Sequence, residues 1–263
     1  MKSIQWRLGT MGFSYSDWRG VFYPAKMNPS NYLSFYARHY NAIELDTTFY
    51  ATPPIDRVKR WRDVTPDDFG FTAKAPKLVT HALTLENAIE PMIEFLKAMR
   101  HLGSKLGVIL FQFPPSFGYE HIDRLRDFLR TLPTDIRYAV ELRDRSWGRE
   151  ETLTMLREQK VGFCSAEYHT QPSRIPITTD FIYLRLIGQH QRFKELDHEQ
   201  IDVTEPLTWW ADEVRKVSDE LSTIWGFFNN DYAGYAPATC NRFKTLIGLP
   251  TSTPADPAQG RLF

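Results

Sequence analysis

Short runs of apolar residues recur along the chain and are separated by longer stretches with helical spacing. The runs are rich in β-branched and aromatic residues, which is typical of strands, and eight of them occur. Strands that alternate with helices predict a parallel sheet built from βα units. The predicted strands are Gln5–Thr10, Ala42–Thr47, Gly70–Lys74, Gly107–Gln112, Tyr138–Arg143, Gly162–Ala166, Phe181–Ile187 and Thr223–Asn229.

Helices are predicted between these strands. Pro54 and Pro206 mark first turns, and Gly103 and Gly248 follow helix ends. The segment Gln171–Asp180 contains two prolines and predicts an irregular crossover after the sixth strand. The predicted helices are Ser30–Tyr40, Ile55–Asp63, Leu85–Leu102, Glu120–Leu132, Glu150–Lys160, Pro206–Leu221 and Thr239–Leu246.

Eight strands with one irregular crossover favour an α/β fold of the TIM-type (β/α)8 barrel class. The 263 residues agree with the roughly 250 of a single barrel domain. A doubly wound dinucleotide fold is disfavoured because no GxGxxG sequence follows a strand. We expect one barrel domain over residues 1–249 and a Pro/Ser/Thr-rich C-terminal tail over residues 250–263.

Charged residues occupy one face of several predicted strands, close to their C-terminal ends. In the second strand, for example, Glu44 and Asp46 alternate with Ile43 and Leu45. Barrel enzymes place their chemistry at this end, so we expect the polar side chains to meet in one cup that solvent can reach. The polar residues on this face are Glu44, Asp46, Lys74, Gln112, Glu141, Arg143 and Arg185.

Two carboxylates in such a cup are candidates for acid–base catalysis. Glu44 and Glu141 serve as general base and acid if their surroundings separate their pKa values. Lys74 is a candidate anion anchor or, if desolvated, an amine nucleophile. Arg143 and Arg185 suit a carboxylate or phosphate group of a substrate. The alternative is that these charges only neutralise one another in a buried network, which is a poor stabilising device.

Further candidates for substrate binding follow the strands. Polar side chains at the ends of the fourth and last strands can orient a ligand or hold a phosphate, although turn formation also explains some of them. Aromatic side chains at the junctions of strands and loops can stack on a planar or sugar ring. These candidates are Gln112, Asn229, Asn230, Asp231, Trp18, Tyr50 and Trp147.

Composition narrows the class of protein. The chain has 32 basic and 32 acidic residues, and a zero formal net charge argues against a general nucleic-acid coat. With 42% hydrophobic residues a large core can form. Two cysteines, Cys164 and Cys240, cannot build a disulfide framework, so the cytoplasm is the expected location. No apolar run is long enough to predict a membrane span.

Seven sequence segments together resemble the YecE-like family, also called domain of unknown function 72. The resemblance implies a TIM-type barrel and supplies no established reaction. Met11-Gly12-Phe13 stands where the family usually has Ser-Gly-Trp, and Ile187 where it commonly has histidine. The matching segments are GTMGFSYSDWRGVFYP, AIELDTTFYATP, FTAKAP, LFQFPPSF, AVELRDRSW, IYLRLIG and FFNNDYAGYAPA.

Our leading hypothesis is an enzyme that uses acid–base chemistry on a small anionic substrate, phosphorylated or sugar-like, without an obligatory cofactor. A divalent-metal isomerase or endonuclease-like barrel is the first alternative. A non-enzymatic nucleic-acid-binding module is the second, and salt-dependent binding distinguishes it. The metal alternative uses Glu44, Asp46, Glu141, Glu167, His169 and Asp231. The nucleic-acid alternative uses Arg19, Lys26, Arg57, Lys59, Arg60, Arg192 and Lys194.

Overall fold

The eight predicted strands are present in the computed structural model, which describes residues 4–82, 84–168 and 174–251. All neighbouring strands run parallel, in the order β1-β8-β7-β6-β5-β4-β3-β2. The sheet therefore curls into a nearly closed TIM-type barrel, which confirms the predicted fold class. The strands are β1 (Gln5–Thr10), β2 (Ala42–Leu45), β3 (Gly70–Lys74), β4 (Leu106–Gln112), β5 (Arg137–Glu141), β6 (Gly162–Glu167), β7 (Phe181–Leu186) and β8 (Thr223–Phe228).

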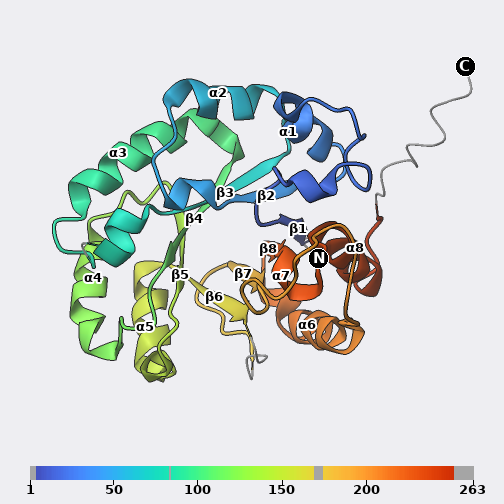
Figure 1. Cartoon of the computed structure of the whole chain (residues 1–263). Helices are drawn as coiled ribbons and strands as arrows, with labels where there is room; N and C mark the ends of the chain where they lie inside the picture. Colours follow the sequence, from blue (N-terminus) through green and yellow to red (C-terminus); the bar gives the residue numbers. More distant parts are fainter. Residues whose placement is uncertain (1–3, 83, 169–173, 252–263) are drawn as a thin grey trace, which may run out of the picture.

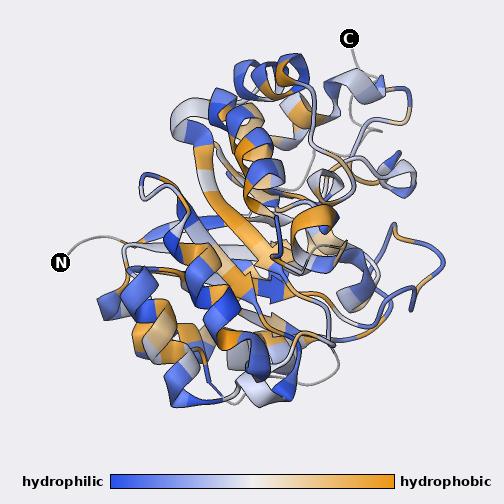
Figure 2. Cartoon of the chain, turned by 90° about the vertical axis from the view of Figure 1, so that its left-hand side faces the viewer, coloured by the Kyte–Doolittle hydropathy of each residue, from blue (hydrophilic) through white to orange (hydrophobic). Residues whose placement is uncertain are grey.

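Helices surround the strands on the outside of the barrel (Figure 1). The helices in view carry both polar and apolar residues, while the strands are largely apolar (Figure 2). This is the pattern of helices that bury one face against a sheet. They are α1 (Tyr32–Tyr36), α2 (Ile55–Asp63), α3 (Ile89–Met99), α4 (Ile122–Arg130), α5 (Glu150–Gln159), α6 (Thr204–Val217), α7 (Asn230–Ala233) and α8 (Ala236–Leu246).

Several element boundaries differ from the prediction. Helix α3 begins at Ile89 and not at Leu85, because Pro91 has no N–H group and fits only the first turn of a helix. Strands β2 and β5 end at Leu45 and Glu141, so Asp46 and Arg143 already belong to the following loops. Short α7, directly after β8, was not predicted.

The irregular crossover after β6 is confirmed as far as it is described, because residues 174–180 contain no helix. The predicted tail lies almost entirely outside the described residues, so the domain boundary stays a prediction. Within the described part of the chain, no helix is long and apolar enough to cross a membrane.

Side chains complete the barrel between β1 and β2. The Tyr36 hydroxyl accepts a hydrogen bond from the Thr10 amide at 2.8 Å and donates one to the Ala42 carbonyl at 3.1 Å. Asn41 accepts from the Leu8 amide at 3.0 Å. In a continuous sheet these backbone groups would bond to the neighbouring strand, and here side chains take the place of that strand. The approach requires glycine at position 9, since a Cβ atom there would lie 1.9 Å from the Ala42 carbonyl oxygen.

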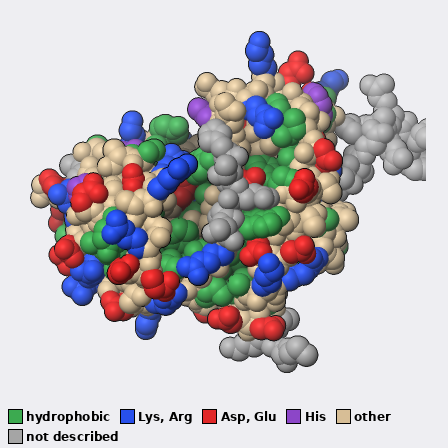
Figure 3. All heavy atoms as spheres, turned by 90° about the horizontal axis from the view of Figure 1, so that it is seen from below, with side chains coloured by type: hydrophobic (Ala, Val, Ile, Leu, Met, Phe, Trp, Pro, Cys, Tyr) green, Lys and Arg blue, Asp and Glu red, His purple; other side chains and the backbone are tan. Residues whose placement is uncertain are grey.

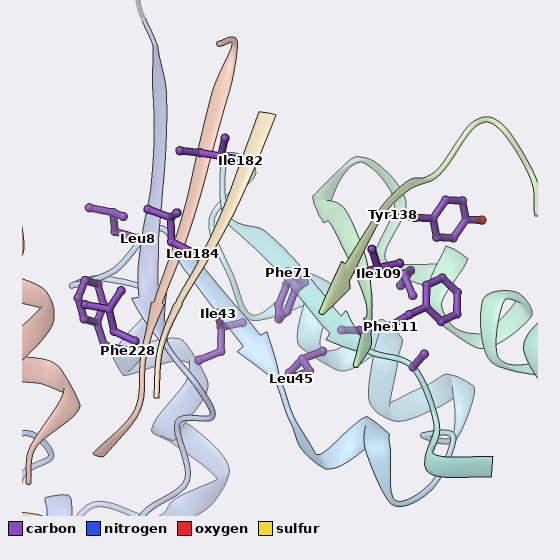
Figure 4. Packing of buried hydrophobic residues seen from close by; sticks show 14 of the residues in the cluster. Leu8, Ile43, Leu45, Phe71, Ile109, Phe111, Tyr138, Ile182, Leu184 and Phe228 are labelled. Atoms are coloured by element: carbon purple, nitrogen blue, oxygen red, sulfur yellow. The ribbon is translucent and has the colours of Figure 1, made fainter. Parts of the chain in front are cut away.

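Strand residues alternate between two separate cores. One set, which includes Ile43, Phe71 and Leu184, faces the helices, as Figure 4 shows for the labelled side chains. The other set, which includes Val108, Leu110 and Trp225, fills the barrel interior. Apolar side chains therefore fill the barrel interior below Glu44, Glu141 and Arg185. The predicted alternation of helix-facing and interior-facing residues along the strands is confirmed.

Candidate functional site

Arg185 lies at the centre of the predicted polar cluster. Its Nε and Nη2 atoms donate to the Glu44 carboxylate at 3.0 and 2.7 Å, and Nη1 donates to Glu141 Oε2 at 2.5 Å. Glu44 is on β2, Glu141 on β5 and Arg185 on β7, so the guanidinium joins three non-adjacent strands across the interior. Charge-assisted forks of this kind are strong and directional.

Further polar side chains complete the bonding of the two glutamates. Tyr183 donates to Glu44 Oε2 at 2.7 Å. Glu141 Oε1 accepts from Gln112 Nε2 at 2.8 Å, from Arg143 Nε at 2.9 Å and from the Tyr168 hydroxyl. Both carboxylates therefore have well-defined partners despite their burial, as buried charges require.

The structure brings the three central residues together but covers them. Glu44, Glu141 and Arg185 are exposed by 0%, 2% and 3%. The expectation that they are open to solvent is therefore not met. The charged side chains next to them are only partly buried, and they include Asp46, Lys74 and Arg143. We call the partly exposed surface that these three side chains form the opening.

The two glutamates have pKa values displaced in opposite directions. Burial raises the pKa of Glu44 to about 7, against the lowering effect of Arg185. Burial also acts on Glu141, but Arg185 and then Arg143 outweigh it and lower that pKa to about 2. At neutral pH Glu141 is therefore ionised, whereas Glu44 is partly protonated.

Lys74 is the cation at the opening that lacks a carboxylate partner. Among the described residues no carboxylate oxygen lies within 4.0 Å of its Nζ atom, which instead lies 3.8 Å from the centre of the Phe49 ring. Burial lowers the pKa of Lys74, and the positive charge of Arg185 lowers it further. An ammonium group in this position favours an anion as its missing partner.

His81 belongs to the same group, although the sequence analysis did not predict it. It lies on η4 (Leu78–Ala82), a π-helical turn after β3, and its ring packs edge-on against Phe49 at 5.1 Å. Burial, followed by the charges of Lys74 and Arg143, lowers the pKa of His81. A neutral imidazole can accept a proton, and π-helical turns are frequent at functional sites.

Arg143 and Asp46 form the other side of the opening. The Arg143 guanidinium lies 4.6 Å from the centre of the Tyr168 ring and donates to the Tyr168 hydroxyl. Asp46 Oδ1 lies 3.5 Å from Arg185 Nη2 and accepts no hydrogen bond from a described residue. Cations and one acidic group thus surround the same entrance.

The three polar residues after β8 have structural partners. Asn229 Oδ1 accepts from the Asp231 amide at 2.9 Å and starts α7. Asn230 is buried, and its Oδ1 accepts from the Ala236 amide at 3.0 Å. Asp231 Oδ2 accepts from the Gln191 amide at 3.2 Å and thereby holds the connection between β7 and α6. Asn229 and Asp231 are nevertheless partly exposed.

The aromatic candidates are not part of the ion cluster, although the Tyr50 ring packs against Phe49, the neighbour of Lys74. Trp18 is completely buried among other rings, and Trp147 donates from Nε1 to the Phe117 carbonyl at 2.6 Å within the core. Neither indole has a free face for a ligand. Tyr50 is 82% exposed on the surface.

The residues of the metal alternative do not form one set of ligands. Arg185 already occupies Glu44 and Glu141, and a metal would have to displace it. Glu167 lies on the opposite face of β6 from the barrel interior, where Trp210 holds it. His169 lies outside the described residues. Over the described ranges, the group with suitable spacing for an ion is Glu195, Asp197 and His198, in the β7–α6 connection.

Sequence reasoning also missed Tyr168 and Tyr183. Tyr183 has the same strand phase as Arg185, so alternation in β7 was the signal for it. Tyr168 directly follows β6, and its position after a strand was the only hint. His81 gave no periodic signal, because its place depends on the shape of a loop.

Fold and site define a (β/α)8 barrel protein with an ion cluster at the C-terminal end of its strands. The chain belongs to the family described as "Protein of unknown function DUF72", whose model matches residues 7–261. This confirms the resemblance found in the sequence.

Two solved structures of this family are similar to the chain. A DUF72 family protein from Thermotoga maritima MSB8 is 32% identical, with a TM-score of 0.77 over 93% of this chain and 99% of that one. A DUF72 family protein from Enterococcus faecalis V583 is 24% identical, with a TM-score of 0.73 over 95% and 100%. The second similarity concerns the fold alone.

Two curated relatives match over shorter regions. The UPF0759 protein YecE of Escherichia coli (strain K12) is 40% identical over 111 residues, 42% of this chain and 41% of YecE. The UPF0759 protein YunF of Bacillus subtilis (strain 168) is 33% identical over 164 residues, 58% of this chain and 57% of YunF. The matched regions thus span less than two thirds of either relative.

Proposed function

We propose that the chain is an enzyme that binds a small anionic, phosphorylated or sugar-like substrate at the C-terminal end of the barrel and acts on it by acid–base chemistry. The observation that carries this proposal is the Lys74 ammonium group, which has no carboxylate partner among the described residues and lies near a second cation, Arg143. A phosphate or carboxylate group supplies the missing negative charge.

Burial divides the roles within the cluster. Arg185 and the two glutamates are covered, so they position Arg143 and set the electrostatic potential of the opening. Lys74 and Arg143 bind the anionic group. His81 and Asp46 are the partly exposed groups suited to proton transfer, and the lowered pKa of His81 keeps its imidazole neutral at pH 7.

Titration with inorganic phosphate tests the binding step. We expect phosphate to raise the melting temperature of the wild-type protein, since a ligand of the folded state stabilises it. Lys74→Met should weaken phosphate binding at least tenfold, about 1.4 kcal/mol. Lys77→Met is the matched control, because Lys77 is an exposed lysine three residues after Lys74, which ends β3.

Two results would contradict the proposal. One is that neither phosphate nor sulfate nor a small dicarboxylate stabilises the wild-type protein. The other is that Lys74→Met and Lys77→Met bind phosphate equally well. Circular dichroism of both variants shows whether they keep the wild-type fold.

A further inference from the structure

A pocket lies beside the ion cluster, between the end of β6 and the connection from β7 to α6. Its volume is about 350 Å³, which is within the range of small-ligand pockets. Polar and apolar groups both line it, among them Glu167, Tyr168, Arg192, Ile201, Pro206 and Tyr232. None of these residues takes part in the anion binding proposed above.

Glu167 is the buried polar group of this pocket. Its side chain leaves β6 on the side of the helices, and Oε2 accepts from Trp210 Nε1 at 2.5 Å and from the Tyr232 hydroxyl at 3.0 Å. The residue is only 8% exposed. Among the described residues, none donates a hydrogen bond to Oε1, and Glu167 is one of the residues that line the pocket. One carboxylate oxygen is thus held by two donors, and the other has no donor among the described residues.

The chemistry of the pocket selects a hydroxyl-bearing ligand. A buried acceptor needs a donor, and an unmade hydrogen bond at such a site is costly. Two further charged side chains line the same pocket. Asp202 is paired with Arg242 at 3.3 Å, and the positive charge of Arg192 disfavours an ammonium group as that donor. The Tyr168 and Tyr232 rings, together with Ile201 and Pro206, provide surface for the C–H faces of a sugar.

Tyr168 connects this pocket to the ion cluster. Its side chain lines the pocket, while its hydroxyl donates to Glu141 and accepts from Gln112 Nε2 at 3.2 Å. The Arg143 guanidinium packs on the same ring. A ligand in the pocket therefore lies next to the residues that hold Arg143.

We infer that this pocket is the subsite for the sugar or polyol part of the substrate whose anionic group binds at Lys74 and Arg143. The inference rests on the proposed function for the anionic group, but the subsite itself can be tested without it. Burial raises the pKa of Glu167, which agrees with a neutral hydroxyl partner that can accept as well as donate a hydrogen bond.

The test uses Glu167→Gln, which keeps the size of the side chain. Trp210 and Tyr232 hold the remaining carbonyl oxygen, so the amide presents a donor to the pocket where an acceptor was. Glu205→Gln, on the exposed surface of α6, makes the same chemical change outside the pocket. Ile201→Trp fills the pocket without changing Glu167 and serves if the first variant does not fold.

Three probes separate the two sites. Inorganic phosphate reports on the anion site, free D-ribose, D-glucose or glycerol on the pocket, and D-ribose 5-phosphate on both. We expect saturation-transfer NMR to detect a free sugar or polyol bound to the wild-type protein and to Glu205→Gln, with loss of the signal in Glu167→Gln and Ile201→Trp. We expect Glu167→Gln to weaken D-ribose 5-phosphate at least fivefold and to leave phosphate unchanged.

The inference is overturned if none of the three free compounds binds the wild-type protein, or if their binding persists in both pocket variants. Binding of a free sugar without binding of phosphate would retain the subsite and reject the proposed anion site. Binding of phosphate without binding of a free sugar or polyol would retain the anion site and reject the subsite.

Discussion

Arg185 balances the charge of two buried carboxylates. Glu44 and Glu141 each accept hydrogen bonds from its guanidinium, and together these residues form a buried ion triad. Such a triad contributes little net stability, but removal of one member leaves the others unpaired. We therefore expect the folded protein to lose stability when any one of the three side chains is removed.

Arg185→Met should lower the free energy of unfolding by about 3 to 5 kcal/mol, because both carboxylates lose their cation. Urea denaturation at pH 7 measures this change. Arg100→Met is the control, since the Arg100–Asp135 pair is exposed and contributes little to stability. Equal stabilities of the two variants would contradict the buried triad.

The pH dependence of stability reports on Glu44. Its ordinary pKa of 4.5 is raised to about 7 in the folded state, so the folded protein keeps this proton between pH 4.5 and 7 while the unfolded chain releases it. The contribution of Glu44 to stability is therefore complete below pH 4.5 and is lost as the pH rises to about 7. Glu141, with its lowered pKa, loses its contribution only as the pH falls below 4.5.

Glu44→Gln removes this titration. Relative to the variant, the wild-type free energy of unfolding should fall by about 2 to 3 kcal/mol between pH 5 and pH 8. Chemical denaturation at several pH values gives both curves. Because the histidines titrate in both proteins, their effects cancel in the difference. Parallel curves would show that the pKa of Glu44 is not raised.

At the scale of single residues, the sequence predicted the central cluster but not its exposure. Alternation within β2 and β7 was enough to put Glu44 and Arg185 on the interior face. Accessibility depends on the side chains and loops above them, which no strand pattern encodes. His81 is the clearest omission, since its place depends on the π-helical turn after β3.

At the scale of elements, β1 and β2 are joined by a short backbone bridge from Met11 and Gly12 to Glu44 and, beyond it, by side chains. The Tyr36 hydroxyl bridges the Thr10 amide and the Ala42 carbonyl, and α1 supplies this tyrosine. The contact ties the first helix to the place where the barrel closes.

Tyr36→Phe should lower the free energy of unfolding by about 1 to 3 kcal/mol, because two buried backbone groups lose their partner. It should also speed hydrogen exchange at the Thr10 amide. Tyr50→Phe is the control, since Tyr50 is an exposed tyrosine. If Tyr36→Phe is as stable as Tyr50→Phe and the Thr10 amide exchanges at the wild-type rate, the bridge has no structural role.

Strands were predicted more accurately than helix ends. All eight strands carry continuous or alternating apolar runs, and their burial on both faces makes this signal strong. The helix ends depended on single residues, as Pro91 shows for α3. The short α7 depends on the Asn229 cap, which as a sequence pattern resembles an ordinary turn.

At the scale of the whole molecule, positive and negative side chains are interspersed. Lys and Arg side chains lie next to Asp and Glu across the face seen in Figure 3. Many of the described arginines also form ion pairs, for example Arg137 with Asp180 and Arg215 with Asp212. This distribution favours a small ligand over the long phosphate backbone of a nucleic acid.

We therefore expect no saturable binding of a fluorescent 20-nucleotide DNA or RNA at 150 mM salt, measured by anisotropy. A tight complex whose affinity falls steeply with salt would instead support the nucleic-acid alternative, because phosphate contacts release counterions. A basic protein of similar size provides the positive control for the assay.

By itself, the sequence determined the order of strands and helices, the barrel class, the family and the identity of the charged residues on the interior face. These properties follow from local periodicity, in which each residue's neighbours along the chain are enough. Tertiary structure decided which charges pair, which lie open to solvent and which pocket Glu167 faces. Those properties depend on residues far apart in the chain. Glu44 and Arg185, for example, are 141 positions apart, and only the folded sheet brings them into contact.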